Sequence, residues 1–197
     1  MIITISGTPG SGKSTIVKIL VENLRAERIY VGGIRRELAK EKSMTLTELN
    51  EYAQTHPETD VDVDEKAAAQ ARKFERGKKV VVVEGRTQYH FLPESIKIFV
   101  NVDVDEAARR IWKDLQQKDM RMQRNEGNIN SLKEMKESIM ERFENDQMRY
   151  KKYYNLDITD TKQYDLVIDT TKITAQEGAQ KIIDFLEKYK KSKHLRR

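Results

Sequence analysis

The chain has 197 residues, with 37 lysines and arginines against 32 aspartates and glutamates, a formal net charge of +5, and no cysteine. This length suffices for one α/β domain with a sizeable core, and the lack of cysteine excludes disulfides and thiolate metal sites. No stretch approaches the roughly 18 apolar residues of a membrane span, and a signal-peptide pattern is absent, so we expect a cytoplasmic protein without a membrane partner. The positive charge favours an anionic ligand, and nucleotides meet this condition as well as nucleic acids do.

Near the N-terminus, residues 7–15 match the phosphate-binding pattern G-x-x-x-x-G-K-[ST] at every fixed position. A β-branched run at residues 1–6 predicts a buried strand before this loop, and apolar residues at helical spacing predict a helix after it. Glycines let backbone N–H groups close around phosphate oxygens, Lys13 brings a charge to the outer phosphates, and the Ser14 hydroxyl is placed to ligate Mg²⁺. An ordinary glycine-rich turn is the alternative, which the order of strand, loop and helix disfavours. The residues predicted to hold the triphosphate are Gly7, Thr8, Pro9, Gly10, Ser11, Gly12, Lys13, Ser14 and Thr15.

Four further apolar runs predict strands, and helical stretches lie between them. Near-continuous valine and isoleucine runs are typical of strands buried on both faces, as in a parallel sheet. The predicted strands after the first are residues 29–31, 79–83, 96–102 and 165–169. The predicted helices after the first are about 34–42, 45 to the His56-Pro57 pair, 64–76, two within 104–155 divided at 125–128, and 174–190. The sequence therefore predicts an α/β fold with a five-stranded parallel sheet flanked by helices, in a single domain over residues 1–197.

Two helix starts carry a capping-box pattern, in which a serine or threonine and a glutamate three residues later exchange hydrogen bonds with the backbone. These starts are Thr45 with Glu48 and Ser131 with Glu134. The helix that opens at Ser131 places apolar residues on one face. We expect the basic tail, residues 188–197, to be a frayed, solvated end rather than an RNA-binding arm.

Polar and charged residues follow the predicted strand at 79–83. Because ligands bind at the carboxyl ends of parallel strands, Glu84 could orient Mg²⁺ or its waters, and Arg86 could grip an acceptor phosphate. A surface ion pair at a turn is the alternative. Arg35 and Arg36 stand at a helix start, where a nearby anion would offset their unfavourable interaction with the helix dipole, and for Arg35 we favour a side chain that points to solvent.

The helix after Ser131 also carries Arg142, Asp146 and Arg149 on one face. This arrangement fits a salt-bridge ladder within the helix, which contributes little stability, and equally a phosphate clamp that closes on bound nucleotide. The lone Trp112 lies in a charged helix, where we expect it to pack rather than to stack on a base.

The ordered set of motifs resembles the cytidylate kinase family in its compact archaeal-type branch, within the nucleoside monophosphate kinases. The resemblance covers nearly the whole chain. It rests on residues 5–15, the stretch Gly32-Gly33-Ile34-Arg35-Arg36-Glu37-Leu38-Ala39, Glu84-Gly85-Arg86, Arg142, residues 149–154, Asp157-Ile158 and residues 164–170.

The resemblance implies a three-layer P-loop kinase fold that uses ATP and Mg²⁺ to convert CMP or dCMP to CDP or dCDP. It implies a monophosphate-binding segment at about residues 32–78 and a lid-type helical segment at about 104–155. Lys13 and Ser14 would hold the ATP phosphates and the metal, and the turn after Asp169-Thr170 would lie near the adenine.

By the same resemblance, Arg36 and Arg86 match positions that grip the acceptor monophosphate. Arg142 and Arg149 resemble lid arginines that stabilise the transferring group, and Asp64 would contact the base or sugar. We expect a monomer with a nucleoside monophosphate as its partner and no nucleic acid.

Two departures from the family pattern lie before the second helix. Tyr30 and Val31 precede the glycines where the family usually has a small polar residue, and Gly33 stands where compact members often carry aspartate. Because reading a base edge takes hydrogen-bonding groups, these departures bear on cytosine specificity more than on phosphoryl transfer. The lid stretch at residues 113–131 is also longer and more charged than expected.

Two other functions remain open on the residues alone. A kinase of another small metabolite would explain the altered base-reading segment. An ATP-driven nucleic-acid or ribosome-associated switch would explain the +5 charge, the basic tail and the charged helices.

Overall fold

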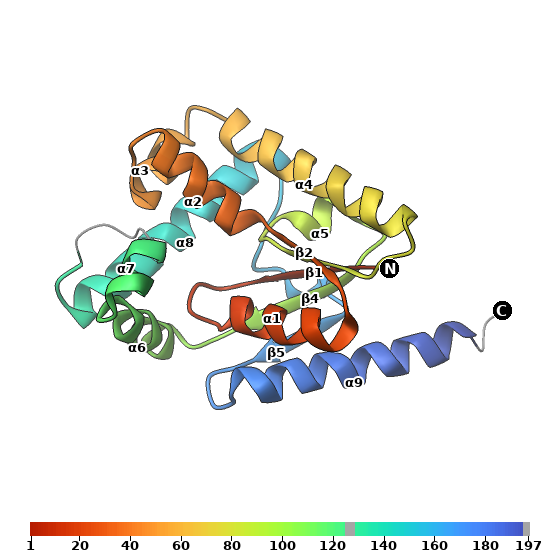
Figure 1. The fold of residues 1–197 in the computed structure, drawn as a ribbon. Helices are drawn as coiled ribbons and strands as arrows, with labels where there is room; N and C mark the ends of the chain where they lie inside the picture. Colours follow the sequence, from red (N-terminus) through yellow and green to blue (C-terminus); the bar gives the residue numbers. More distant parts are fainter. Residues whose placement is uncertain (125–128, 195–197) are drawn as a thin grey trace.

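A parallel β-sheet of five strands forms the centre of the protein (Figure 1). The computed structural model describes residues 1–124 and 129–194. The strands lie in the order β2-β3-β1-β4-β5, and every neighbouring pair is parallel. Their bounds are β1 Ile2–Gly7, β2 Glu27–Tyr30, β3 Val81–Glu84, β4 Ile96–Asn101 and β5 Leu166–Asp169. The predicted sheet is thus confirmed, with strand ends that differ from the expected ones by at most two residues.

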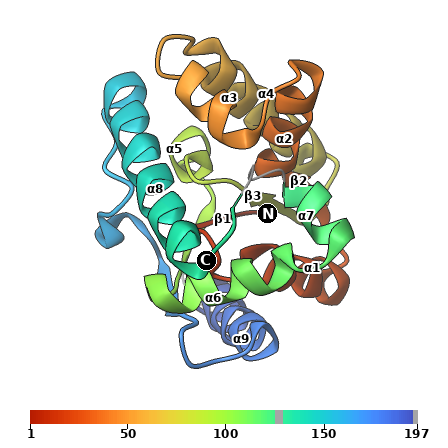
Figure 2. The same ribbon diagram turned by 90° about the vertical axis from the view of Figure 1, so that its left-hand side faces the viewer.

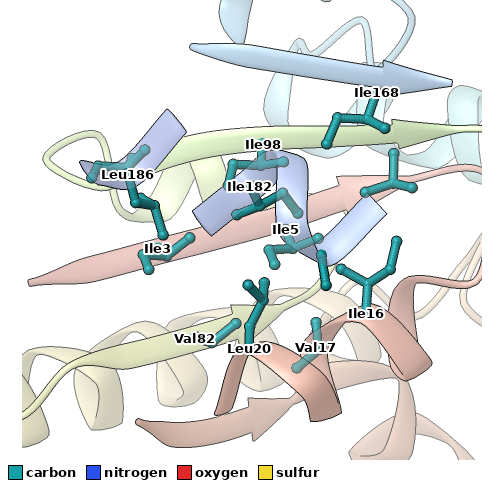
Figure 3. Close-up of a cluster of buried hydrophobic side chains, with 13 residues drawn as sticks. Ile3, Ile5, Ile16, Val17, Leu20, Val82, Ile98, Ile168, Ile182 and Leu186 are labelled. Atoms are coloured by element: carbon teal, nitrogen blue, oxygen red, sulfur yellow. The ribbon is translucent and has the colours of Figure 1, made fainter. Parts of the chain in front are cut away.

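Helices cover both faces of this sheet, which completes a three-layer fold. On one face, Ile3 and Ile5 of β1 pack against Ile16 of α1 and Ile182 of α9 (Figure 3). On the other face, Ile2 packs among the alanines of α4. This alternation follows from the two-residue period of a strand. The helices are α1 Lys13–Leu24, α2 Val31–Glu41, α3 Leu46–Tyr52, α4 Glu58–Arg76, α5 Gln88–Phe91, α6 Val104–Leu115, α7 Lys118–Arg124, α8 Leu132–Tyr154 and α9 Ala175–His194.

The carboxyl ends of the strands meet at one edge of the sheet. Tyr30 at the end of β2 is in register with Glu84 at the end of β3, and Gly7 at the end of β1 is in register with Val100 of β4. Beyond this edge, α2, α3 and α4 gather on one side and α6 on the other, with α8 running between them (Figure 2). The phosphate-binding loop and the residues after β3 therefore open into the same space.

Several helix boundaries differ from the predicted ones. Helix α2 begins at Val31, so Gly32 and Gly33 lie inside its first turn rather than before it. Helix α4 begins at Glu58 rather than at residue 64. The prediction missed the first turns because their buried face is polar and carries no apolar periodicity. Acidic residues in its first turn favour this earlier start through the helix dipole. Helix α3 ends at Tyr52, before the expected histidine–proline stop.

The charged segment after β4 contains three helices within the described residues, α6, α7 and α8, instead of two. The predicted division at 125–128 lies outside the described residues. The capping box at Thr45 is complete. At Ser131 it is only half formed: the serine hydroxyl accepts from the backbone N–H of Glu134, but the Glu134 carboxylate accepts from the backbone N–H of Asn130 instead of that of Ser131. Trp112 packs against the cluster between α6 and α8, as expected.

Helix α9 continues through His194, so the described part of the basic tail is helical rather than frayed. The expectation for residues 195–197 lies outside the described residues. Across the helices that the structure describes, none combines the length and the apolar character that crossing a membrane requires.

Candidate active site

The loop between β1 and α1 is fixed by close approaches that only glycine permits. Gly7 has a φ of 142°, and a Cβ there would lie 2.0 Å from the carbonyl oxygen of Val100. Gly10 has a φ of 72°, and a Cβ there would lie 2.8 Å from the Cα of Ala107 on α6. A left-handed glycine, Gly12, then precedes the first turn of α1. The loop is therefore held against β4 and α6, with the N-terminus of α1 at its end.

Lys13 lies across this loop and its ammonium group donates to the loop itself. Nζ is 2.9 Å from the carbonyl oxygen of Gly7 and 2.5 Å from that of Thr8. The pKa of Lys13 is lowered to about 7, first by burial and then by the charges of Arg86, Arg142 and Arg36, against the opposing effect of Glu84. A bound polyphosphate would offset the positive charge of these arginines and stabilise the protonated form of Lys13.

The two residues predicted to serve the metal lie in direct contact. The Ser14 hydroxyl donates to Oε1 of Glu84 at 2.5 Å, and Nη2 of Arg28 donates to Oε2 of the same carboxylate at 2.6 Å. Hydroxyl and carboxylate oxygens are the donors that Mg²⁺ prefers, so the pair fits this ion. In residues 1–124 and 129–194, no three histidine, cysteine or acidic side chains group closely enough to hold a metal. Phosphate oxygens and water would have to complete the coordination.

Arg86 forms a buried ion pair with Asp146 of α8, not the surface pair considered as an alternative. Its backbone carbonyl accepts from the Ser6 hydroxyl at 2.9 Å, which fixes the turn after β3. Burial lowers the pKa of Arg86 to about 9, and the charge of Arg142 contributes. Burial of the guanidinium and the nearby charge of Arg142 both disfavour its protonated form, and the Asp146 carboxylate is its anionic partner.

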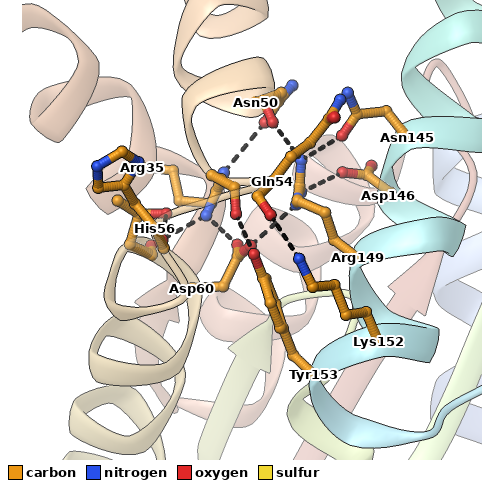
Figure 4. Close-up of polar contacts among 12 residues, drawn as sticks. Arg35, Asn50, Gln54, His56, Asp60, Asn145, Asp146, Arg149, Lys152 and Tyr153 are labelled. Atoms are coloured by element: carbon orange, nitrogen blue, oxygen red, sulfur yellow. Dashed lines mark hydrogen bonds and ion pairs between the residues drawn. The ribbon is translucent and has the colours of Figure 1, made fainter.

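Arg149 is 1% exposed and belongs to a buried polar network between α8 and the helices α3 and α4 (Figure 4). It donates to the carboxylates of Asp60 and Asp146 at 2.9 and 2.6 Å. It also donates to the Asn50 carbonyl and to the Asn145 side chain at 3.1 and 2.7 Å. The Arg149–Asp146 contact is thus part of a network across helices rather than a solvated ladder. A role of Arg149 toward the transferring group stays a prediction.

The expectation that Arg35 points to solvent is wrong. Its side chain is buried and pairs with the Asp60 carboxylate, and it donates to the Thr59 carbonyl and to Oδ1 of Asn50, both at 3.0 Å. The early start of α4 explains the error, because it brings Asp60 to face α2. A buried charge needs such a partner, and Asp60 serves both Arg35 and Arg149.

Arg36 points to the opposite side of α2 and links the predicted monophosphate-binding and lid segments. Nε donates to the carbonyl of Arg124 at the end of α7 at 3.0 Å. Nη1 donates to the Tyr30 hydroxyl at 2.8 Å and to the Gly32 carbonyl at 3.1 Å. The charges of Arg36, Arg86 and Arg142, which come from three other parts of the chain, all act on Lys13.

The comparisons with known proteins agree with this arrangement. Residues 3–130 match a family model described as an AAA domain. A cytidylate kinase from Methanocaldococcus jannaschii is 37% identical over 177 residues, which cover 87% of this chain and 89% of that protein. The chain belongs to the cytidylate kinase family. The resemblance drawn from the motifs is thereby confirmed.

One further relative and one solved structure resemble this cytidylate kinase family member. An S-adenosylmethionine-dependent nucleotide dehydratase from Lacinutrix mariniflava is 33% identical over 187 residues, but the chain spans only 36% of that protein's length. The solved shikimate kinase from Bacteroides thetaiotaomicron superposes with a TM-score of 0.59 over 95% of this chain and 98% of its own, at 17% identity. At that identity the likeness concerns the fold alone, and it agrees with the predicted fold class.

The sequence did not single out two residues that shape the site of this cytidylate kinase family member. Arg28 on β2 holds Glu84, and Asp60 on α4 holds two arginines. Arg28 could have been found from the sequence, because a charged residue two positions before the last residue of a strand lies on the same face of the sheet as that last residue. Asp60 carries no such local signal.

Asp64, the predicted base or sugar contact, is fully engaged by protein groups. Its carboxylate accepts from the hydroxyls of Thr87 and Tyr154 at 2.7 and 3.1 Å and from the Gln88 amide at 2.9 Å. Burial raises the pKa of Asp64 to about 6 from its ordinary 3.8. Contact with a ligand stays a prediction for this residue.

The raised pKa of Asp64 predicts a specific dependence of stability on pH. The folded state binds the Asp64 proton more tightly than the unfolded state does. The free energy of unfolding therefore rises as the pH falls from above 6 toward 4. When the pH is lowered from 8 to 5, the free energy of unfolding of wild type should rise by about 1 kcal/mol relative to that of Asp64→Asn. Urea denaturation at both pH values measures this, with Asp62→Asn on the exposed face of α4 as the matched control. A constant difference between wild type and Asp64→Asn would contradict it.

Proposed function

We propose that the protein transfers the terminal phosphoryl group of ATP to a nucleoside monophosphate, with CMP or dCMP as the preferred acceptor. The observation that carries this proposal is that Lys13 lies inside the phosphate-binding loop and the charges of Arg86, Arg142 and Arg36 all act on it. Bound anions would stabilise such a concentration of half-buried positive charge. Two phosphate-bearing substrates would supply that charge.

Phosphoryl transfer needs positioning and electrostatic stabilisation more than covalent help from the protein. The loop amides and Lys13 would hold the phosphates of ATP, and Arg36 and Arg86 would hold the acceptor phosphate so that its oxygen lies in line with the γ-phosphorus. Arg142 would stabilise the charge on the migrating group. When bound between Ser14 and Glu84, Mg²⁺ would supply further neutralisation of the phosphate oxygens.

The helices around the carboxyl edge support a second requirement, which is the exclusion of water. Arg36 already joins α2 to the end of α7, and Arg86 already joins the turn after β3 to α8. Substrate phosphates would take over these guanidinium contacts and draw the same helices toward the phosphate-binding loop. Hydrolysis of ATP would then be slow compared with transfer to the acceptor.

A coupled assay of ADP release across CMP, dCMP, UMP, AMP and GMP tests the proposal. We expect CMP and dCMP to show kcat/KM in the usual enzymatic range of about 10⁴–10⁸ M⁻¹s⁻¹, with the other acceptors lower. ATP turnover that no monophosphate stimulates would contradict the function. A preference for another base would contradict only the acceptor assignment.

A further inference from the structure

Tyr30 stands at the junction between the sheet and the predicted acceptor site. It is the last residue of β2, lies beside Glu84 of β3 in the parallel register, and immediately precedes α2. Its ring lies over the first turn of α2, where the two consecutive glycines are found.

The space for the ring depends on the glycines. A Cβ on Gly33 would lie 2.6 Å from Cδ1 of Tyr30, and a Cβ on Gly32 would lie 3.0 Å from Cε2. Neither glycine is among those with positive φ, so the backbone itself does not demand them. Glycine is unfavourable inside a helix, and its presence at both positions is explained by the clearance that the aromatic ring needs.

The two ends of Tyr30 contact two arginines. The hydroxyl oxygen accepts from Nη1 of Arg36 at 2.8 Å, and the ring centroid lies 4.7 Å from Cζ of Arg28. Arg28 in turn pairs with Glu84, which accepts from Ser14. A continuous series of contacts thus runs from the phosphate-binding loop, through Tyr30, to Arg36.

Nearby cations oppose the orientation in which the hydrogen bonds of Arg36 hold its guanidinium. Lys13 lies close enough for the charge of Arg36 to lower its pKa, and Arg86 and Arg142 act on the same lysine. Loss of the phenol contact would weaken the hold on Arg36 against repulsion and side-chain entropy, which both favour rotation of its guanidinium away from the site. The phenol supplies a neutral acceptor that holds the guanidinium without neutralising it.

We propose that Tyr30 is a positioning residue that orients Arg36 toward the acceptor phosphate, and that Gly33 is required to seat its ring. This inference rests on the proposed function, since it assigns the acceptor phosphate to Arg36.

The variant Tyr30→Phe tests the hydroxyl while keeping the ring. We expect the KM for CMP to rise about tenfold, with kcat and the KM for ATP within about twofold of wild type. Tyr189→Phe, on α9 where the ring packs against Phe185, is the matched control. Thermal unfolding of each variant separates this effect from a loss of stability, which would affect both substrates.

Gly33→Ala tests the clearance. In wild type we expect this change to raise the KM for CMP by about tenfold, because the methyl group displaces the ring and with it Arg36. In a Tyr30→Ser background, where no ring is present, the same change should add less than about twofold. Equal effects of Gly33→Ala in both backgrounds would overturn the pairing.

The outcomes separate the two proposals. Absence of acceptor-stimulated turnover in the wild type would overturn the proposed function and this inference together. Normal CMP turnover with an unchanged KM for CMP in Tyr30→Phe would overturn the positioning role alone. A parallel loss for CMP and ATP in Tyr30→Phe would also overturn it, since a general structural role has no preference between substrates.

Discussion

Replacing Lys13 with alanine is expected to reduce kcat by about 10³-fold while leaving the fold intact. The ammonium group lies inside the phosphate-binding loop and is the charge closest to where the outer phosphates of ATP would bind. Its loss would remove stabilisation of the transferring group that no neighbouring residue replaces. The folded state should not suffer, because burial and nearby arginines already disfavour the charged lysine, as its lowered pKa shows.

Steady-state kinetics with saturating ATP and CMP measure this effect, and circular dichroism with thermal unfolding checks the fold. Lys18→Ala, at an exposed position on the same helix, is the matched control. A rate for Lys13→Ala within about tenfold of wild type would mean that the loop does not hold the reacting phosphates.

Replacing Arg86 with alanine should raise the KM for the acceptor far more than the KM for ATP. A charge-assisted contact with a phosphate corresponds to about 10–100-fold in apparent affinity. The turn after β3 places this guanidinium beside α8, where it pairs with Asp146. Asp146 would lose one of its two buried partners, so the variant should also unfold at a lower temperature.

Initial-rate measurements with each substrate varied in turn, well below the unfolding temperature, provide the two KM values. Arg86→Lys is the informative companion, because it keeps the charge and loses the planar, bidentate geometry. It should fall between wild type and Arg86→Ala. A similar rise in both KM values for Arg86→Ala would show that the acceptor phosphate binds elsewhere.

The fold and the phosphate-binding loop could be predicted because their signals are local. Most of the strands are short runs rich in valine and isoleucine, and the loop is a contiguous motif whose glycines reflect specific contacts, such as that of Gly7 with Val100. The meeting of Ser14 with Glu84 also followed from sequence, since parallel strands end at one edge.

The buried network could not be predicted because its partners are far apart and polar. Arg149 and Asp60 are 89 positions apart, and no local sequence pattern around either residue indicates that the two pair. The start of α4 carries acidic residues on a buried face, where apolar periodicity is the usual guide. The mistaken placement of Arg35 in solvent followed from that missed turn of helix. Tyr30 was recognised only as a departure, because its role depends on side chains from β2, β3 and α2 together.

The unusual acid strength of Lys13 has a consequence for ligand affinity. With a pKa of about 7, the lysine is partly uncharged in neutral solution, and arrival of a polyphosphate would restore its charge. Nucleotide association would then take up a proton from the buffer. The observed heat of association would depend on the ionisation enthalpy of that buffer, and affinity would decline as the solution becomes alkaline.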